Sequence, residues 1–517
     1  MTLVTPTTAH DQSVAEAAVA GEMPLRIGTP AEFDTVRRFF RANQFDERTV
    51  CAALDIPDMG RIQHARGATI DPAVVPPALL TLIDLFIFES AVPSADFRRI
   101  CGDDVFAALS ALNLIRPAKH REGAIVCPAW VYPLHEFVVA SDRCRDADGE
   151  PGWPPPDAVF PANDSGTLKL LRLLPPARGG DTLDLCGGSG IVALQLAKAA
   201  DRAFTSDITA RAAHMAHFNG RLNGLAIESV CGDLYASVGA RQFEVITAHP
   251  PWVPSVGDAA VYRDGGELGD TIIQRIVEGL PRHLLPGGTA LIFSIARDTA
   301  EATYENRVRG WLGEAGRDCD VILGVESVLP PEQVIGSIRE LYFKDNPVDG
   351  DRMADRIRNS GTDKFIYGAL FVRRTDRPLT EPPLRVRLSS KATAADFDRL
   401  FAWRAYRRSA SFDDDMTTAR PRLASGFEIN IRQVVKDGTL ATEGAVLKVE
   451  GALPSRLNTE PWTIPLFSAF DGEHTVEQIF ERTCKAERMP DVFTRTAFTS
   501  FVTLLIERGF VEIDGPP

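Results

Sequence analysis

The sequence predicts an α/β protein built around a doubly wound parallel sheet of seven strands. Helical segments at residues 191–200, 210–222, 270–285 and 300–312 lie between short apolar runs. The seven runs are 182–185, 203–206, 227–231, 243–248, 289–295, 321–328 and 365–372. Strands and helices that alternate in this way are typical of a parallel sheet covered by helices. A glycine-rich turn between the first strand and its helix supports this fold class, because such sheets bind ligands there.

The length of 517 residues predicts about three domains. We expect a flexible leader over residues 1–27 and a helical domain over 28–150. The α/β domain follows over 157–375, and an α+β domain covers 380–517. A proline-rich joint at 150–156 marks the first boundary, and a helical insertion at 331–345 precedes the last strand of the sheet.

The N-terminal domain begins with an amphipathic helix, whose apolar side would carry Phe33, Val36, Phe39 and Phe40. A long apolar helix is expected from about residue 77. Short helices at 95–100 and 105–112 precede a strand pair at 114–117 and 124–128. Helices followed by a hairpin resemble a winged helix. Because no basic recognition helix is visible, the pattern favours docking or dimerisation over DNA binding.

The C-terminal domain is expected to combine strands and helices. Its predicted strands are 428–434 and 444–449. In the segments that follow, 465–480, 492–508 and 509–513, we expect a turn at Asp471-Gly472, a helix that begins after Thr475, and a helix stop at Gly509. The arrangement resembles the small winged-helix modules that bind leader peptides in peptide natural-product pathways. Arginines between residues 402 and 422 come nearest to a basic patch, and we expect them on a solvated face.

The overall charge and composition exclude several classes of function. A formal net charge of −14 counts against nucleic acid as a partner, because phosphate contacts require lysine and arginine. Eight cysteines without a C-x-x-C pair predict neither a zinc site nor a disulfide framework. The N-terminus has no signal-peptide pattern, and the most apolar run, 75–88, is shorter than the ~20 residues that span a bilayer. We therefore expect a cytoplasmic protein without metal or membrane association.

The glycine-rich turn, Cys186-Gly-Gly-Ser-Gly190, lacks the G-x-G-x-x-G spacing of dinucleotide-binding folds. With the strand before it, the turn resembles the first motif of class I S-adenosylmethionine methyltransferases. That resemblance implies that Asp184 lies near the ammonium end of the cofactor, that Asp207 binds the ribose hydroxyls, and that Asp233 binds the adenine. Asn219 and Asn223 match the N-x-x-x-N-G that closes the second helix in many of these enzymes. The cofactor-binding residues implied are Asp184, Gly187, Gly188, Gly190, Asp207, Ile208, Asp233 and Leu234.

The segment His249-Pro-Pro-Trp252 follows the fourth strand and resembles the (Asn/Asp/Ser)-Pro-Pro-(Tyr/Phe/Trp) motif of amino- and amide-methylating enzymes. Together with segments at 262–266 and 285–288, it is similar to the release-factor glutamine methyltransferase group over roughly residues 157–300. The resemblance implies that the first side chain and the carbonyl of Pro250 accept hydrogen bonds from a planar NH₂ group. Trp252 would stack on that group.

His249 departs from this motif, which usually begins with asparagine. A neutral imidazole has only one acceptor nitrogen, unlike a carboxamide, which also donates. It could instead act as a general base near neutral pH, which would allow an acceptor that must lose a proton. The substitution puts glutamine methylation in question.

These observations predict an enzyme that uses S-adenosyl-L-methionine to methylate a nitrogen of a small-molecule or peptide substrate, in specialised natural-product metabolism. His249, Pro250 and Trp252 are the expected catalytic residues. The alternatives are methylation of protein glutamine or nucleic-acid adenine, and O-methylation with His249 as the base. A different class is a non-catalytic regulator that binds the cofactor. A terminal domain could also form a homodimer.

Overall fold

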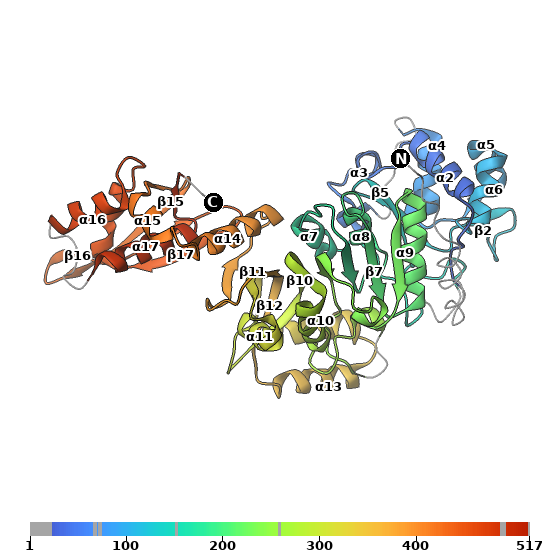
Figure 1. Cartoon of the computed structure of the whole chain (residues 1–517). Coiled ribbons are helices and arrows are strands. Elements are labelled where there is room, and N and C mark those ends of the chain that lie inside the picture. The colour runs from blue at the N-terminus through green and yellow to red at the C-terminus, as the bar shows by residue number, and fades with distance from the viewer. Residues whose placement is uncertain are drawn as a thin grey trace. The chain divides into compact units, whose positions relative to one another are not determined.

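The computed structural model of the chain describes residues 23–65, 70, 75–149, 154–256, 260–485 and 493–514 (Figure 1). Its residues form two compact units. The first contains the described residues up to 319 together with 328–381, and the second contains 320–327 and the described residues from 382 onward. Residues 1–22, most of the predicted leader, lie outside the described residues, as do 150–153 of the proline-rich joint. No helix in the described ranges is long and apolar enough to cross a membrane.

The first unit is built on a mostly parallel sheet. Six strands lie wholly in this unit, in the order β12-β10-β9-β6-β7-β8. They are β6 (Thr182–Leu185), β7 (Ala203–Asp207), β8 (Ile227–Cys231), β9 (Phe243–Ala248), β10 (Leu284–Thr299) and β12 (Thr362–Arg374). The pairs β6–β7, β7–β8, β6–β9 and β9–β10 are all parallel, so the carboxyl ends of these strands share one edge.

All seven predicted strands are present, because β11 (Cys319–Leu329) accounts for the remaining one. The prediction that the sheet is wholly parallel is wrong for β12, which pairs antiparallel with β10 from Thr289↔Arg373 onward. Both strands carry nearly continuous buried runs. Such a run indicates burial on both faces but does not encode strand direction, which explains the error.

The helices of this unit begin and end where local chemistry directs them. Thr209 caps α9 (Ala210–Asn223) by accepting a hydrogen bond from the backbone N–H of Ala212, and Gly224 ends the helix in the left-handed conformation. The remaining helices near the predicted positions are α8 (Ile191–Leu196), α10 (Thr271–His283) and α11 (Tyr304–Leu312). The insertion predicted at 331–345 forms the helix α12 (Pro331–Tyr342), and a second helix, α13 (Pro347–Arg358), follows beyond the predicted bounds.

The N-terminal segment belongs to the same compact unit as this sheet. Its first helix, α2 (Pro30–Ala42), buries the four predicted side chains, and Phe33 packs edge-on against Phe218 of α9 at a centroid distance of 5.2 Å. The other helices are α3 (Glu47–Leu54), α4 (Pro77–Leu82), α5 (Ser94–Cys101) and α6 (Asp103–Ala111). The helix expected from residue 77 changes at Ile83–Ile87 into a π-helix, a widening that hydrophobic periodicity does not reveal.

A strand of the N-terminal segment is hydrogen-bonded to two asparagines of α9, Asn219 and Asn223. A small sheet has the order β1-β3-β2, with strands β1 (Val92–Pro93), β2 (Arg116–Pro117) and β3 (Ala124–Val126). A hairpin that was not predicted joins β4 (Trp130–Leu134) to β5 (Phe137–Ser141). Fully buried Asn219 accepts from the Ala140 N–H of β5 at 2.8 Å and donates to the Ala140 carbonyl at 2.9 Å. Its amide also donates to the Ser189 carbonyl in the glycine-rich turn at 2.9 Å. The N-terminal segment therefore helps to hold that turn.

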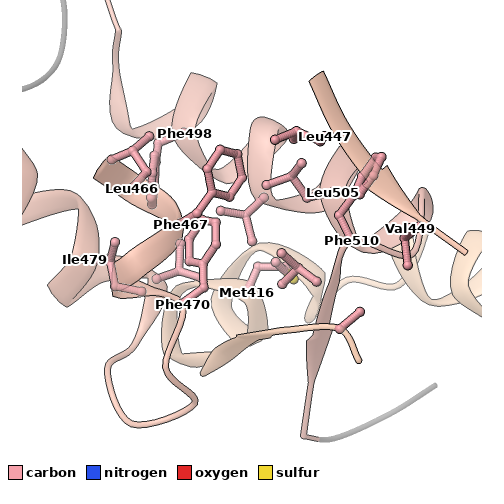
Figure 2. Close-up of a cluster of buried hydrophobic side chains, with 14 of the residues drawn as sticks. Met416, Leu447, Val449, Leu466, Phe467, Phe470, Ile479, Phe498, Leu505 and Phe510 are labelled. Atoms are coloured by element: carbon pink, nitrogen blue, oxygen red, sulfur yellow. The ribbon is translucent and has the colours of Figure 1, made fainter. Parts of the chain in front are cut away.

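The second unit has a core of its own, rich in phenylalanine (Figure 2). Phe467, Phe470, Phe498 and Phe510 meet there with side chains from several elements. The helices are α14 (Ala394–Arg407), α15 (Phe412–Thr418), α16 (Val476–Lys485) and α17 (Arg495–Glu507). The strands are β13 (Leu384–Arg387), which pairs with β11, then β14 (Pro421–Leu423) with β18 (Val511–Ile513), and the meander β15 (Phe427–Lys436), β16 (Thr439–Val449) and β17 (Ser455–Thr459).

The expectation that the arginines of 402–422 form a solvated face is wrong for Arg404. Its side chain is buried, and its Nε lies 3.0 Å from Oδ1 of the buried Asp320 in the same unit. A buried charge requires a partner of opposite sign, and Asp320, remote in sequence, supplies it.

Candidate active site

A cavity of about 570 Å³ opens at the edge where the parallel strands of the first unit end. Asp184 and Cys186 lie at the end of β6, Asp207 ends β7, and His249 directly follows β9. All four line the cavity. Parallel strands that end together therefore bring residues widely separated in sequence to one site.

The glycine-rich turn forms one wall. Gly187 and Gly188 line the cavity, and the Gly188 N–H donates to Oδ2 of Asp207 at 3.1 Å. Gly190, predicted to bind the cofactor, is not among the lining residues. It has a φ of 77°, and a Cβ there would stand 2.8 Å from the Cβ of Ala216 on α9. Glycine at 190 is thus required by the close packing of the turn on the helix.

Two carboxylates lie at this edge, of which Asp184 is buried and Asp207 is half-buried. Asp184 accepts a hydrogen bond from the Thr247 hydroxyl at 2.8 Å, and burial, partly opposed by that bond, raises the pKa of Asp184 to about 7. Burial also raises the pKa of Asp207, although the N–H groups of Thr209 and Gly188 donate to its carboxylate. A cation or a hydroxyl donor bound in the cavity would stabilise the ionised form of both carboxylates.

The third predicted acid is more open. Asp233 and Arg275 form an ion pair at 2.7 Å, with side chains 48% and 44% exposed. One oxygen of Asp233 is therefore already engaged. Its neighbour Leu234 and the exposed Ile208 also line the cavity.

His249 is held by a short chain of hydrogen bonds. The Thr167 hydroxyl donates to Oδ2 of Asp164 at 2.5 Å, and the same Oγ1 lies 3.3 Å from Nδ1 of His249. A carboxylate only accepts, so the single hydroxyl proton points to Asp164. The imidazole must then donate from Nδ1, which leaves Nε2 as its acceptor. Burial lowers the pKa of His249, with the charge of Asp164 opposing, and this favours the neutral ring.

This arrangement depends on the start of α7 (Ser165–Leu173), a helix that the sequence interpretation missed. Asp164 caps α7 by accepting from the N–H groups of Gly166 and Thr167. A Cβ on Gly166 would stand 2.8 Å from Cε1 of His249, so the ring packs where only glycine fits. An Asp-x-x-Thr pattern signals a helix cap, but nothing local indicates a partner 82 residues away.

Aromatic side chains also line the cavity. Pro250, Pro251, Trp252 and Tyr342 of α12 line it. The rings of Phe160 and Tyr262 stack with centroids 5.3 Å apart, and Phe160 is 52% exposed. Trp252 packs against an apolar cluster supplied largely by α12 and α13. Arg356 of α13 also donates to the Ser255 carbonyl at 2.6 Å, so the insertion braces the segment after the Pro-Pro pair.

No group of three or more histidine, cysteine or acidic side chains within the described ranges could hold a metal ion. The eight cysteines are all free thiols. Of these thiols, Cys186 lines the cavity, and burial raises its pKa well above the ordinary value, which favours the protonated form.

The family model and the relatives that match this chain are those of methyltransferases. The model of the family described as "methyltransferase small domain" matches residues 157–311. The chain is 33% identical to the ribosomal protein uL3 glutamine methyltransferase of Burkholderia pseudomallei, over 45% of this chain and 79% of that protein. It is 27% identical to the release factor glutamine methyltransferase of Geobacter sulfurreducens, over 26% of this chain and 53% of that protein.

A third relative is the ribosomal RNA small subunit methyltransferase C of Klebsiella pneumoniae, with 29% identity over 26% of this chain and 36% of that protein. The chain thus spans about half the length, 53%, of the Geobacter relative.

Proposed function

Because the chain belongs to the class I S-adenosylmethionine-dependent methyltransferases, we propose that it methylates a nitrogen of a small-molecule or peptide substrate in the cavity beside His249. Membership of this family makes the chain an enzyme and S-adenosylmethionine its cofactor. The regulator without catalytic activity is therefore set aside. When bound, the cofactor supplies a methyl group activated by a sulfonium.

The residues predicted to bind the methyl donor fit S-adenosylmethionine. Its ammonium and sulfonium are cationic, and the buried carboxylate of Asp184 is free to face the ammonium. The two oxygens of Asp207 suit the paired ribose hydroxyls, and the second oxygen of Asp233 suits the adenine amino group. Gly187 and Gly188 let the cofactor approach the backbone, with Ile208 and Leu234 beside the adenine.

The observation that carries the proposal is the hydrogen-bonded chain from Asp164 through Thr167 to His249. With Nδ1 donating, Nε2 accepts one N–H of the acceptor, orients the nitrogen lone pair, and takes the proton released when the N–C bond forms. The carbonyl of Pro250 would accept a second N–H, and the ring of Trp252 would lie along a planar group. Orientation of this kind supplies a large part of a methyl-transfer rate.

The relatives leave the acceptor open. Two of them are named for a protein glutamine and one for ribosomal RNA, and none for natural-product metabolism, so that prediction remains a prediction. The side-chain nitrogen of a protein glutamine is the competing acceptor. RNA also stays in the test, although a net charge of −14 counts against it.

The test has two stages. First, S-adenosylhomocysteine should raise the midpoint of thermal unfolding of the full chain, whereas a nicotinamide dinucleotide should not. Second, glutamine-containing peptides, small primary amides and amines, carboxylic acids and ribosomal RNA are incubated with labelled S-adenosylmethionine, and products are located by mass spectrometry. Methyl on nitrogen that disappears with His249→Ala supports the proposal. Methyl found only on oxygen, or unchanged turnover of the variant, would refute it.

A further inference from the structure

We propose that Arg263 binds an oxyanion, a carboxylate or phosphate, carried by the acceptor substrate. The inference rests on the proposed function of the cavity, and it narrows the acceptor to molecules with a negative charge beside a planar or apolar body. Arg263 lines the cavity, and its guanidinium lies over the ring of Tyr342, which lines the cavity too.

The backbone holds Arg263 beside the Pro-Pro segment. Arg263 ends the short 3₁₀ turn η4 (Val261–Arg263), and its carbonyl accepts from the Val253 N–H at 3.0 Å. The Gly265 N–H in turn donates to the Val253 carbonyl at 2.9 Å. Val253 directly follows the segment 249–252. These two hydrogen bonds therefore place the backbone of Arg263 beside the segment that would hold the methyl acceptor.

The charged side chains that line the cavity are mostly acidic. Arg263 is the sole lysine or arginine among its lining residues in the described part of the chain. Six aspartates also line it: Asp157, Asp164, Asp184, Asp207, Asp233 and Asp264. The neighbour, Asp264, accepts from the Ser255 hydroxyl at 3.1 Å and the Gly266 N–H at 2.9 Å. A free anion would be repelled by this cavity in general, so Arg263 marks the place where one is tolerated.

The guanidinium has hydrogen-bonding capacity to spare. Its central carbon lies 5.0 Å from the ring centroid of Tyr342 and 5.7 Å from that of Phe343. Its buried Nε meets no hydrogen-bond acceptor among the described residues. Rings over a guanidinium fix its plane and leave the N–H groups at its edge, which is the geometry that binds a carboxylate or phosphate in two-pronged fashion. A bound oxyanion would satisfy the buried donor.

The walls around Arg263 describe the rest of the ligand. The stacked rings of Phe160 and Tyr262, with Trp252 and Tyr342, offer flat apolar surfaces. They suit a planar body that spans from Arg263 towards His249. An alternative role for Arg263 is to pin α12 to the loop through its contacts with Tyr342 and Phe343, and the experiment separates the two roles.

The experiment uses the full chain saturated with S-adenosylhomocysteine and three probes of the same shape: benzoate, phenyl phosphate and the neutral benzamide. Calorimetry or ligand-observed NMR should show at least one of the two anions binding about tenfold more tightly than benzamide. Arg263→Gln should abolish that preference, while Arg263→Lys should retain about threefold of it, because the charge remains but the planar fork is lost. Arg358→Gln is the matched control, since it removes an equally charged but exposed arginine that pairs with Glu332 on α12 and α13.

Equal binding of all three probes to the unaltered chain, or a preference that survives Arg263→Gln, would overturn the inference. If Arg263→Gln does not fold, Arg263→Lys decides: an undiminished tenfold preference in a folded Lys variant would also overturn the inference. Stabilisation by S-adenosylhomocysteine is measured on every variant. Its absence from the unaltered chain counts against the proposed function, whereas a failed anion preference with intact stabilisation counts only against Arg263.

Discussion

Oγ1 of Thr167 lies 3.3 Å from Nδ1 of His249, while its proton is committed to Asp164. This contact decides which nitrogen of the imidazole is free. It also explains how a histidine can take the first position of a motif that usually holds asparagine. Asparagine accepts through a fixed carbonyl oxygen, and here a hydroxyl and a carboxylate give the histidine one defined acceptor.

Loss of the Thr167 hydroxyl should therefore impair turnover more than binding. In Thr167→Val the imidazole is free to change tautomer, so we expect kcat to fall about tenfold or more while the Kd for S-adenosylhomocysteine is unchanged. Thr167→Ser keeps the hydroxyl and should retain most of the activity. Steady-state kinetics with an acceptor that the product assay has identified measures this, and a Val variant as active as the Ser variant would contradict the role of the chain of hydrogen bonds.

The acid side of the pH profile should report His249. Because burial lowers its pKa, the ring stays neutral at pH 7, and kcat/KM should fall only when the pH drops below the ordinary histidine value of 6.5. Protonation removes the acceptor at Nε2, which is why activity is lost towards low pH. His249→Asn has no titrating ring, so its profile, recorded for the acceptor with the cofactor saturating at every pH, should lack that limb. The same limb in both proteins would assign it to another group.

Cofactor affinity should depend on pH through Asp184. Burial raises the pKa of Asp184 to about 7, whereas the ammonium of the cofactor favours the ionised carboxylate. Below pH 7 the carboxylate must lose a proton before it binds, so the Kd for S-adenosylhomocysteine should rise by up to about tenfold per pH unit. Calorimetry in two buffers of different ionisation enthalpy would detect the released proton. In Asp184→Asn this dependence should vanish. A flat affinity in the unaltered chain would place the ammonium elsewhere.

Truncation of Asn219 should destabilise the first unit. Asn219→Ala leaves the buried N–H and carbonyl of Ala140 and the carbonyl of Ser189 unpaired, and we expect a loss of about 3 kcal/mol in the free energy of unfolding. Asn223 makes the same pair of bonds to Val138 but is half-buried, so Asn223→Ala should cost about 1 kcal/mol. Urea unfolding of both variants measures the difference, and equal losses would show that burial of Asn219 is not the cause.

The sequence alone predicts that several residues of the cavity lie together. Asp184, Asp207 and His249 could be assigned to one site because each ends a parallel strand, and such ends meet whatever their separation in sequence. Gly190 was placed correctly in the turn, but its contact with Ala216 lies across a helix interface that the motif does not encode. The roles assigned to these residues in binding remain predictions.

The other half of the cavity could not be read in this way. Thr167, Tyr342 and Phe160 come from segments with no motif, and they reach the site only through the packing of α7 and the insertion α12–α13. The direction of β12 could not be predicted either, because its buried run of residues would look the same in a parallel strand. Contacts between remote elements, rather than local propensity, built this half.

The bonds of Asn219 have a consequence for how this protein can be divided. The match to the family model begins at residue 157, yet the strand β5 that pairs with Asn219 ends at Ser141. A fragment cut at the family boundary would expose the carboxamide of Asn219 and loosen the turn that it secures. Chimaeras with other methyltransferases should therefore exchange the upstream hairpin together with α9, as one cooperative folding unit.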